Sequence, residues 1–450
     1  MSGGADSVAL LVALASLCAS HAVLRGRALR AVHVHHGLRP SADDWARHCR
    51  ALCRTLGIPL SVRRISVPRV RGRSLEAEAR SARYAALARG LRRGEWLLTA
   101  HHEDDQLETL LLQLMRGAGV AGLAGMPRCT IFETGFLVRP FLGESRSTLE
   151  QWLRARDIAW VDDDSNVDER FDRNYLRQRV VPLLRARWPA ATTVAARSAA
   201  HLGEARELLE VLAASDLQAV GVGVAGVVDS GRLIDLERLR KLSVARQRNL
   251  LRYWLLQRGL SLPDAVHLER IRTELPAARR DAQPCVRWDG GEVRRFKGRL
   301  YALSPALAAH AALATCPSPA PQAARKSGAT RPWHWRRQPR FELGAGRGAL
   351  CLVVDPDGPI AAKSLPKTLR VGRREGGETL VTESGGPRRA LKELLRVAGI
   401  PPWEREGLPI VFAADIVAVG DLFVAASYRT TVGVTPTKER MRLVWEGRFC

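Results

Sequence analysis

The first residues of the chain contain a phosphate-binding pattern. Residues 1–7 are Met-Ser-Gly-Gly-Ala-Asp-Ser, and an apolar run typical of a helix follows them. Glycines allow successive backbone N–H groups to face one anion, and the following helix presents its positive N-terminal end. The hydroxyls of Ser2 and Ser7 add donors, and Asp6 is placed to hold Mg²⁺ against a pyrophosphate. The loop lacks the lysine and the spacing of a kinase-type nucleotide loop. Six residues alone do not distinguish an anion-binding site from a glycine-rich helix cap without a ligand.

A second group of reactive side chains lies in residues 97–109, with the sequence LLTAHHEDDQLET. His101, Asp105 and Glu108 are four and three residues apart, so a helix that begins here places them on one side. Asp104 and Asp105 would also stabilise the N-terminus of that helix. Capping requires one carboxylate, however, and not two beside adjacent histidines. We therefore predict a catalytic cluster at this strand–helix junction.

Two other motifs are individually weak. Residues 32–39, VHVHHGLR, end a predicted strand, and their histidines could be simple polar caps. Residues 75–84, LEAEARSARY, predict a helix in which Glu76 and Arg80 are four apart. Surface helices often carry such pairs, so this spacing alone does not indicate function.

Helical and strand patterns alternate over residues 5–160, which predicts an α/β domain with a Rossmann-like parallel sheet and ligands at the carboxyl ends of its strands. The expected helices are Ser7–Leu24, Ser41–Leu56, Leu75–Leu91 and Glu103–Met115, and the expected strands are Leu29–Val34, Leu60–Val67 and Trp96–Ala100. A mainly helical segment with a short β-like piece, a linker rich in Ala, Pro and Ser, and a small α+β segment come next. The predicted division is 1–195, 196–305, 306–332 (the linker) and 333–450.

The charge balance favours a polyanionic partner. The chain has 450 residues, with 70 basic and 46 acidic side chains and a formal charge of +24, and only seven of the basic residues are lysine. An arginine-biased genome would explain arginine in place of lysine, but it would not explain the shortage of acids. Arginine suits bidentate phosphate contacts, so the composition favours a nucleic-acid partner.

Cysteine usage and hydropathy indicate a soluble, cytoplasmic protein. The eight cysteines form no Cys-x-x-Cys pair and have no histidines at zinc spacing, which fits a reducing compartment. The longest apolar run, Val8–Leu17, is too short to cross a bilayer, so no membrane association is expected.

The motifs together resemble a known family. The loop at residues 2–7 is similar to the SGGxDS loop of N-type ATP pyrophosphatases, which cleave ATP between its α and β phosphates. In order and spacing, the later motifs resemble tRNA(Ile)-lysidine synthases, and the resemblance covers nearly the whole chain. These motifs are residues 97–109, 116–126, 139–142, 160–166, 173–177, 251–254, 294–301, 369–378 and 399–403.

The resemblance implies a two-step reaction on tRNA(Ile) with the anticodon CAU. The C2 oxygen of the first anticodon cytidine attacks the α-phosphate of ATP, and pyrophosphate leaves. The ε-amine of L-lysine then displaces AMP at C2, giving lysidine, and the codon read changes from AUG to AUA. Residues 1–195 would be the catalytic domain, and residues 196–305 and 333–450 would bind the tRNA.

The resemblance also implies residue roles. Ser2, Gly3, Gly4, Ala5, Asp6 and Ser7 would bind ATP, and Asp6 and Asp105 would hold Mg²⁺. The expected catalytic residues are Asp6, Arg80, His101 and Asp105, with Arg80 stabilising charge on the α-phosphate. Asp105 and Glu108 are the candidates for binding lysine, and a homodimer is an open alternative to a monomer.

One departure from the family and two alternative functions are relevant. In the family's fold a central strand precedes the SGGxDS loop, whereas here the loop begins at residue 2, so we expect the first strand to be missing. A truncated, non-catalytic tRNA-binding protein is therefore one alternative. Another tRNA-modifying enzyme with the same loop, such as a thiolase, is the second; the scattered cysteines argue against it.

Overall fold

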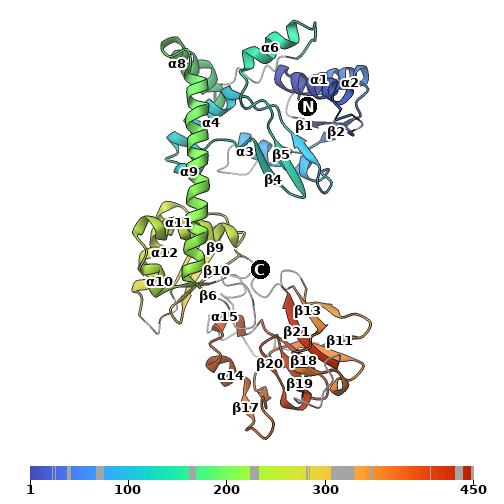
Figure 1. The fold of residues 1–450 in the computed structure, drawn as a ribbon, viewed down its shortest axis with the longest axis vertical. Helices are drawn as coiled ribbons and strands as arrows, with labels where there is room; N and C mark the ends of the chain where they lie inside the picture. Colours follow the sequence, from blue (N-terminus) through green and yellow to red (C-terminus); the bar gives the residue numbers. More distant parts are fainter. Residues whose placement is uncertain are drawn as a thin grey trace. The chain divides into compact units, whose positions relative to one another are not determined.

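The computed structural model describes residues 1–22, 24–25, 27–37, 42–66, 75–161, 169–222, 233–279, 282, 284–305, 330–344, 348–405, 407–430 and 439–446. The chain forms two compact units, Met1–Leu208 and Leu209–Cys450, whose boundary falls inside the long helix α9, Ala191–Val220 (Figure 1). Residues 306–329 of the predicted linker lie outside the described residues, and Arg331 and Pro332 belong to strand β11. No described helix combines the length and apolarity needed to span a membrane.

The first unit confirms the predicted α/β alternation. Strand β1 (Ala31–His35) pairs in parallel with β2 (Leu60–Arg64), and β3 (Trp96–Leu98) pairs in parallel with β5 (Gly135–Val138). An antiparallel hairpin joins β5 to β4 (Cys129–Phe132). The helices are α1 (Ala5–Ser20), α2 (Ala42–Thr55), α3 (Leu75–Ala88), α4 (Glu103–Met115), α5 (Val120–Leu123), α6 (Arg146–Arg154), α7 (Asp172–Tyr175), the π-helical turn η2 (Leu176–Val180) and α8 (Val181–Arg187).

Apolar packing fixes the start of α1. Ala5, Val8, Ala9 and Val12 are spaced along one face of this helix and pack against Leu149 and Leu153 of α6. The amine of Met1 donates to the carbonyl of Val32 in β1 at 2.8 Å. The loop at residues 2–4 is thus held between strand β1 and the buried face of α1.

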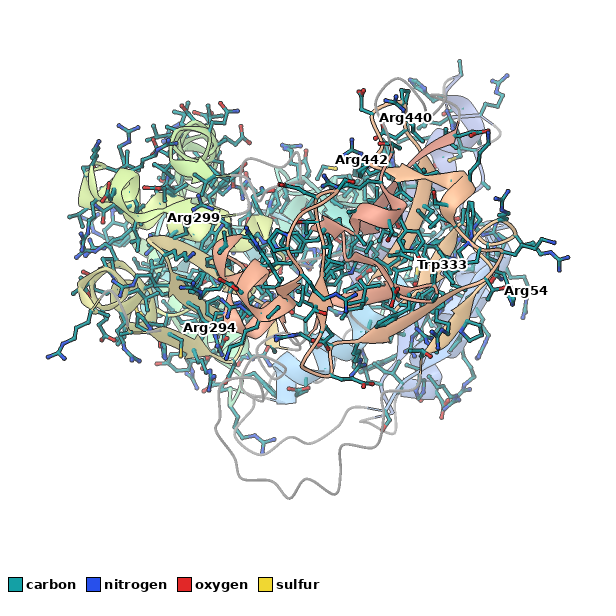
Figure 2. All side chains as sticks on the ribbon, turned by 90° about the horizontal axis from the view of Figure 1, so that it is seen from below. Arg54, Arg294, Arg299, Trp333, Arg440 and Arg442 are labelled. Atoms are coloured by element: carbon teal, nitrogen blue, oxygen red, sulfur yellow. The ribbon has the colours of Figure 1, made fainter. Side chains whose placement is uncertain are left out.

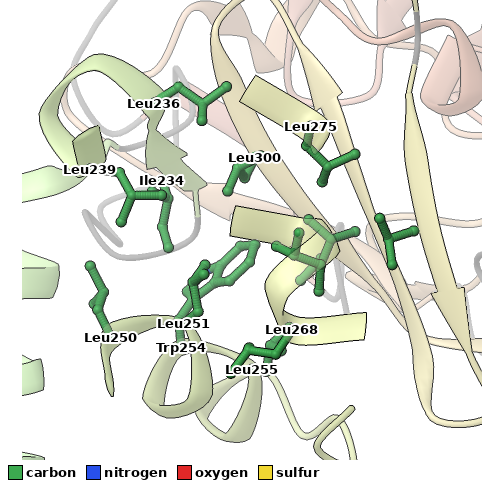
Figure 3. Close-up of a cluster of buried hydrophobic side chains, with 14 of the residues drawn as sticks. Ile234, Leu236, Leu239, Leu250, Leu251, Trp254, Leu255, Leu268, Leu275 and Leu300 are labelled. Atoms are coloured by element: carbon green, nitrogen blue, oxygen red, sulfur yellow. The ribbon is translucent and has the colours of Figure 1, made fainter. Parts of the chain in front are cut away.

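The middle of the chain combines helices with an antiparallel sheet. The helices are α10 (Leu236–Arg240), α11 (Val244–Gln257) and α12 (Ala265–Ala277). The sheet has the order β6–β7–β10–β9–β8, with bounds Gly221–Val222, Leu233–Asp235, Arg299–Leu303, Gly291–Phe296 and Cys285–Trp288. Its core contains Trp254 of α11, which is fully buried in a cluster with leucines of α10, α11, α12 and β10 (Figure 3).

The C-terminal part is rich in β-structure and carries two short helices, α14 (Leu391–Val397) and α15 (Pro402–Arg405). One sheet has the order β11–β15–β18–β19–β20, with bounds Arg331–Trp333, Leu369–Arg373, Pro409–Phe412, Ile416–Val419 and Phe423–Val424. A second has the order β12–β13–β21–β14, with bounds Arg340–Glu342, Ala349–Val354, Arg440–Glu446 and Ile360–Ala361. The hairpin β16–β17 (Thr379–Leu380 and Arg389–Ala390) and the 3₁₀ turns η4 (Ala362–Ser364) and η5 (Ala426–Tyr428) complete it.

Candidate active site

The loop before α1 is organised by the hydroxyl of Ser7. The backbone N–H groups of Ser2 and Gly3 each donate to Ser7 Oγ at 3.1 Å, and this hydroxyl donates to the carbonyl of Gly4 at 3.0 Å. Gly3 has φ of +100°, a backbone conformation that other residues rarely adopt. Two backbone donors therefore converge on one point at the positive end of a 16-residue helix. Backbone N–H groups at the N-terminal end of a helix can bind an anion.

The start of α4 buries an unusual run of polar residues. Asp104, Asp105, Gln106 and Glu108 are each at most 9% exposed. The N–H of His102, the residue before the helix, donates to Asp105 Oδ2 at 3.1 Å. Burying several charged groups is costly, and groups kept in such positions are concentrated at functional sites.

The loop and this polar run meet at His102. His102 Nε2 lies 3.7 Å from Asp6 Oδ2 and 3.5 Å from Asp105 Oδ2. The ring itself is 2% exposed. The structure thus brings Asp6 of α1 and Asp105 of α4 to the same nitrogen of one imidazole, so the two predicted groups share one site.

The electrostatics of this contact favour the ion pair. Burial opposes charge on His102, but its hydrogen bond to Asp6 and the attraction of Asp105 outweigh burial, and the pKa of His102 is raised. Burial also opposes charge on Asp6, yet His102, Arg146 and Arg177 together lower the pKa of that carboxyl.

Asp6 and Asp105 also suit a magnesium ion that shares its shell with phosphates. Asp6 Oδ1 is buried and has no hydrogen-bond partner among the described residues. No group of three or more His, Cys, Asp or Glu side chains in the described part of the chain has metal-binding geometry. Mg²⁺, however, usually takes one or two carboxylates, with waters and substrate phosphates as its other ligands. The two aspartates are therefore sufficient as a donor set.

His101, the histidine predicted to be catalytic, has a different environment from His102. Its Nδ1 lies 2.9 Å from Thr99 Oγ1, at the end of β3. Burial lowers the pKa of His101 to about 4, so the ring is neutral at pH 7 and can accept a hydrogen bond or a proton. His102 was not predicted as a site residue, although it stands in the same motif; only the direction of each ring distinguishes the two.

Glu108, a predicted lysine ligand, is fully engaged by Arg177. Arg177 Nε donates to Glu108 Oε1 at 2.7 Å, and its Nη2 donates to Oε2 at 3.0 Å. The same Nη2 lies 3.5 Å from Asp105 Oδ1. Glu108 is 1% exposed, so an incoming ammonium would have to displace the guanidinium to reach it. Arg177 stands in a family motif, residues 173–177, but was not predicted as part of the site.

Asp104 connects His102 to the first turn of α9. Its Oδ2 lies 3.3 Å from His102 Nδ1 and accepts the backbone N–H of Arg146 at 2.9 Å. Its Oδ1 pairs with Arg185, whose guanidinium donates to Thr192 Oγ1 at 3.0 Å. Sequence analysis considered Asp104 only as a helix cap, because its partners are 42 and 81 residues away.

Arg80, predicted to stabilise the α-phosphate, lies on α3 beside Tyr84. Its Cζ is 5.2 Å from the centroid of the Tyr84 ring. Together with Arg83 and Arg139 it contributes positive charge that acts on His101. The structure therefore places Arg80 near His101, on a side of the site with its own group of cations.

Known families match most of the chain. Residues 1–184 match the PP-loop domain, residues 234–301 the TilS substrate binding domain and residues 369–445 the TilS substrate C-terminal domain. A tRNA(Ile)-lysidine synthase of Pseudomonas aeruginosa is 45% identical over 427 residues, which are 94% of this chain and 88% of the relative. The enzyme of Coxiella burnetii is 38% identical, over 92% of this chain and 86% of the relative, and that of Salmonella heidelberg is 37% identical, over 99% and 95%.

Proposed function

The chain belongs to the family of tRNA(Ile)-lysidine synthases, and from this premise we propose that it converts the first anticodon cytidine of tRNA(Ile) to lysidine. ATP would be cleaved to AMP and pyrophosphate, and L-lysine would be the incoming amine. The matches at both ends of the chain favour this function over a thiolase or a non-catalytic tRNA-binding protein.

The observation that carries the proposal is the meeting of Asp6 and Asp105 at His102. An enzyme that adenylates a base needs the nucleotide's phosphates and the reacting group in one place. Here Asp6 of the phosphate loop and the carboxylates of Asp104 and Asp105 in α4 contact the same buried imidazole. A phosphate loop on the far side of the sheet from α4 would have been incompatible with the reaction.

We assign the residue roles as follows. Residues Ser2–Ser7 hold the pyrophosphate part of ATP, and the backbone donors of Ser2 and Gly3, which meet at the Ser7 hydroxyl, would exchange this partner for phosphate oxygens. Asp6 and Asp105 would hold Mg²⁺, which would neutralise negative charge on the phosphates. Arg80 stabilises charge on the α-phosphate, and the neutral ring of His101 accepts a hydrogen bond or a proton near the reacting base.

Asp105 is better placed than Glu108 to bind the ammonium group of lysine. Both oxygens of Glu108 accept from Arg177, whereas Asp105 Oδ1 has only the longer contact of 3.5 Å to the same guanidinium. We therefore assign Glu108 the task of holding Arg177 beside Asp105.

The proposal is tested by release of AMP and pyrophosphate that depends on both tRNA(Ile) and L-lysine, with lysidine detected by mass spectrometry of the digested tRNA. Release of AMP and pyrophosphate without lysidine, or with an unrelated tRNA as efficiently, would contradict it.

The Asp105→Ala variant should bind tRNA with unchanged affinity and form no lysidine, because its carboxylate contacts only site residues. Asp105→Asn separates the two roles of this carboxylate. Loss of pyrophosphate release in the absence of lysine would identify a role with the metal, and a raised KM for lysine alone would identify the ammonium site. Normal turnover by the alanine variant would exclude both roles.

A further inference from the structure

A cluster of three arginines surrounds Tyr84 and His101. The guanidinium carbons of Arg80 and Arg83 lie 5.2 Å and 5.6 Å from the centroid of the Tyr84 ring. Arg139, at the end of β5, is hydrogen-bonded to Tyr84, and all three arginines act electrostatically on His101. We call Arg80, Arg83 and Arg139 the arginine cluster. Its members come from α3 and from the strand that pairs with β3, so the sheet and the helix together bring them close.

Among the residues that the structure describes, the arginine cluster forms no ion pair with a carboxylate, and Arg139 donates to the carbonyl of Pro127 at 2.7 Å. Arg139 is 6% exposed, and its Nε is buried with no hydrogen-bond partner among the described residues. Burial lowers the pKa of both Arg83 and Arg139; Tyr84 acts in the opposite direction, and Arg80 lowers the pKa of each further. Asp105 raises the pKa of Arg83, but by less than Arg80 or Arg173 lowers it. Arg177, by contrast, is paired with Glu108.

Buried positive charges without paired carboxylates are costly in the free protein. Such an arrangement is stabilised when an anion binds, and the planar guanidinium is suited to bidentate contacts with phosphate. The burial and the mutual repulsion of the arginine cluster therefore indicate a phosphate ligand.

The arginine cluster differs in its partners from the cations beside Asp105 and Asp104. Arg177 pairs with Glu108, and Arg146 pairs with Glu150. Arg80 and Arg83 instead lie over the Tyr84 ring, and Arg139 donates to the carbonyl of Pro127. The cluster is therefore a second group of cations, and we assign it a phosphate other than those held by the loop.

We propose that Arg83 and Arg139 bind a backbone phosphate of the tRNA next to the reacting cytidine, an assignment that rests on the proposed function. An enzyme that acts on a base must draw it out of its stack, and contacts to the flanking phosphates fix the position of the extruded nucleotide. Arg80 remains with the α-phosphate of ATP, so the arginine cluster spans the two substrates that must react. The chemistry recognised is a phosphate, and its source is what the experiment decides.

The test uses the full chain with Arg83→Gln and Arg139→Gln, and Arg54→Gln as the matched control. Arg54 is an exposed arginine of α2, in the same unit, and lies outside the site. The dissociation constant for tRNA(Ile) is measured over a range of salt concentrations, and the affinity for ATP is measured in parallel. Each site variant should weaken tRNA binding severalfold and reduce the slope of log Kd against log salt by about 1, while ATP affinity is unchanged. The control should change neither quantity.

Two outcomes would overturn the assignment. Weakened ATP binding with an unchanged tRNA slope would show that the phosphate belongs to the nucleotide. Unchanged affinity for both tRNA and ATP would show that the arginine cluster is not a binding site.

The stability of the variants is a separate control. Because the arginines of the cluster repel one another, the site variants should unfold at no lower temperature than the wild type. If either variant is destabilised, Arg83→Lys and Arg139→Lys serve instead, because lysine retains the positive charge. These variants should show the wild-type slope of log Kd for tRNA against log salt. A reduced slope in the folded lysine variants would also contradict the assignment.

This test is independent of the proposed function. If the wild type forms no lysidine but the glutamine variants show a reduced salt dependence of tRNA binding, the proposed function fails and the phosphate site stands. If the wild type forms lysidine and the glutamine variants keep the wild-type salt dependence, only the phosphate site fails.

Discussion

The pairing of Glu108 with Arg177 shows how the site retains charge in a buried position. Glu108 alone would be disfavoured as an anion, since burial raises its pKa, and Arg177 acts in the opposite direction. The carboxylate in turn helps to raise the pKa of Arg177 against its own burial. Because Arg177 Nη2 also lies 3.5 Å from Asp105 Oδ1, this pair fixes a cation beside Asp105.

Replacing Arg177 with methionine should destabilise the protein, because it leaves a buried carboxylate without a partner. Breaking a buried ion pair typically costs about 3–5 kcal/mol. Urea unfolding measures this loss. Arg179→Met is the control, since Arg179 pairs with Glu169 on the surface and both side chains are more than a third exposed; such a pair contributes about 1 kcal/mol or less. Equal losses in the two variants would contradict the role of burial.

The loss in Arg177→Met should depend on pH. In the wild type, Arg177 partly offsets the rise in the pKa of Glu108 that burial causes. Without Arg177, the pKa of Glu108 in the folded state lies even further above its ordinary value of 4.5. The folded state then binds a proton more readily than the unfolded state, so stability is greatest at low pH and falls as the pH rises through the folded pKa. The deficit relative to the wild type should therefore shrink as the pH is lowered from neutral toward 4.5. A deficit independent of pH would mean that Glu108 is not the group left unpaired.

Residue types could be predicted from the sequence more readily than their orientations. The spacing of Asp105 and Glu108 indicated a shared helix face, and both are buried at the start of α4. Which of two adjacent histidines faces Asp6 depends on the direction in which the chain leaves β3, and sequence spacing contains no such information. Arg177 is 69 residues from Glu108, so only the folded chain shows their contact.

At the scale of elements, the phosphate loop depends on one glycine more than on its neighbour. Gly3 has φ of +100°, whereas Gly4 is the N-cap of α1 with φ of −72° and ψ of 163°. A Cβ at Gly4 would approach other atoms no closer than 3.7 Å, an ordinary contact. The two glycines therefore offer a comparison in which only the backbone conformation differs strongly.

Gly3→Ala should destabilise the protein by about 1–3 kcal/mol, the usual cost of a strained backbone conformation. It should also weaken ATP binding, because the N–H groups that converge on Ser7 Oγ would be redirected. Gly4→Ala should change thermal stability by less than about 1 kcal/mol, since alanine tolerates its backbone angles. Thermal unfolding and ATP titration measure both effects. Equal stability of the two variants would show that the loop relaxes without cost.

Element types were predicted well and element pairing was not. The predicted bounds Glu103–Met115 coincide with α4, because its start is marked by carboxylates and its end by glycines. The predicted helix Ser7–Leu24 is observed as Ala5–Ser20. The antiparallel hairpin of β4 with β5 was not predicted, since strand partners depend on tertiary contacts.

At the scale of the whole molecule, long-range packing was the least predictable feature. Trp403 of α15 is 6% exposed and packs against Phe296 and Tyr301 of the middle sheet, with ring centroids 5.8 Å and 5.6 Å away. Residues 300–301 and 399–403 belong to separate family motifs, but nothing in either indicates that the other is its partner. The contact shows that the middle and C-terminal parts of the second unit share buried aromatic surface.

Net charge, by contrast, is a property that sequence alone determines. Basic side chains project from strands and helices throughout the described chain, including Arg54, Arg299, Arg440 and Arg442 (Figure 2). Many of the surface arginines are paired, such as Arg442 with Asp355, but the excess of +24 leaves far more cations than anions. That excess is available to the phosphates of a bound tRNA.

The affinity for tRNA should consequently fall steeply with salt, because each phosphate contact releases condensed counterions. A protein making about 6–10 such contacts loses about 10³–10⁵ in affinity between about 50 and 200 mM salt. We expect a loss of at least about 10³-fold for tRNA(Ile), measured by filter binding across that range. ATP is the matched control, since it carries far fewer phosphates than a tRNA and should lose much less affinity. An affinity for tRNA that falls less than about tenfold over the same interval would mean that the positive charge is spread over faces the tRNA never touches, and that recognition rests on a few buried contacts instead.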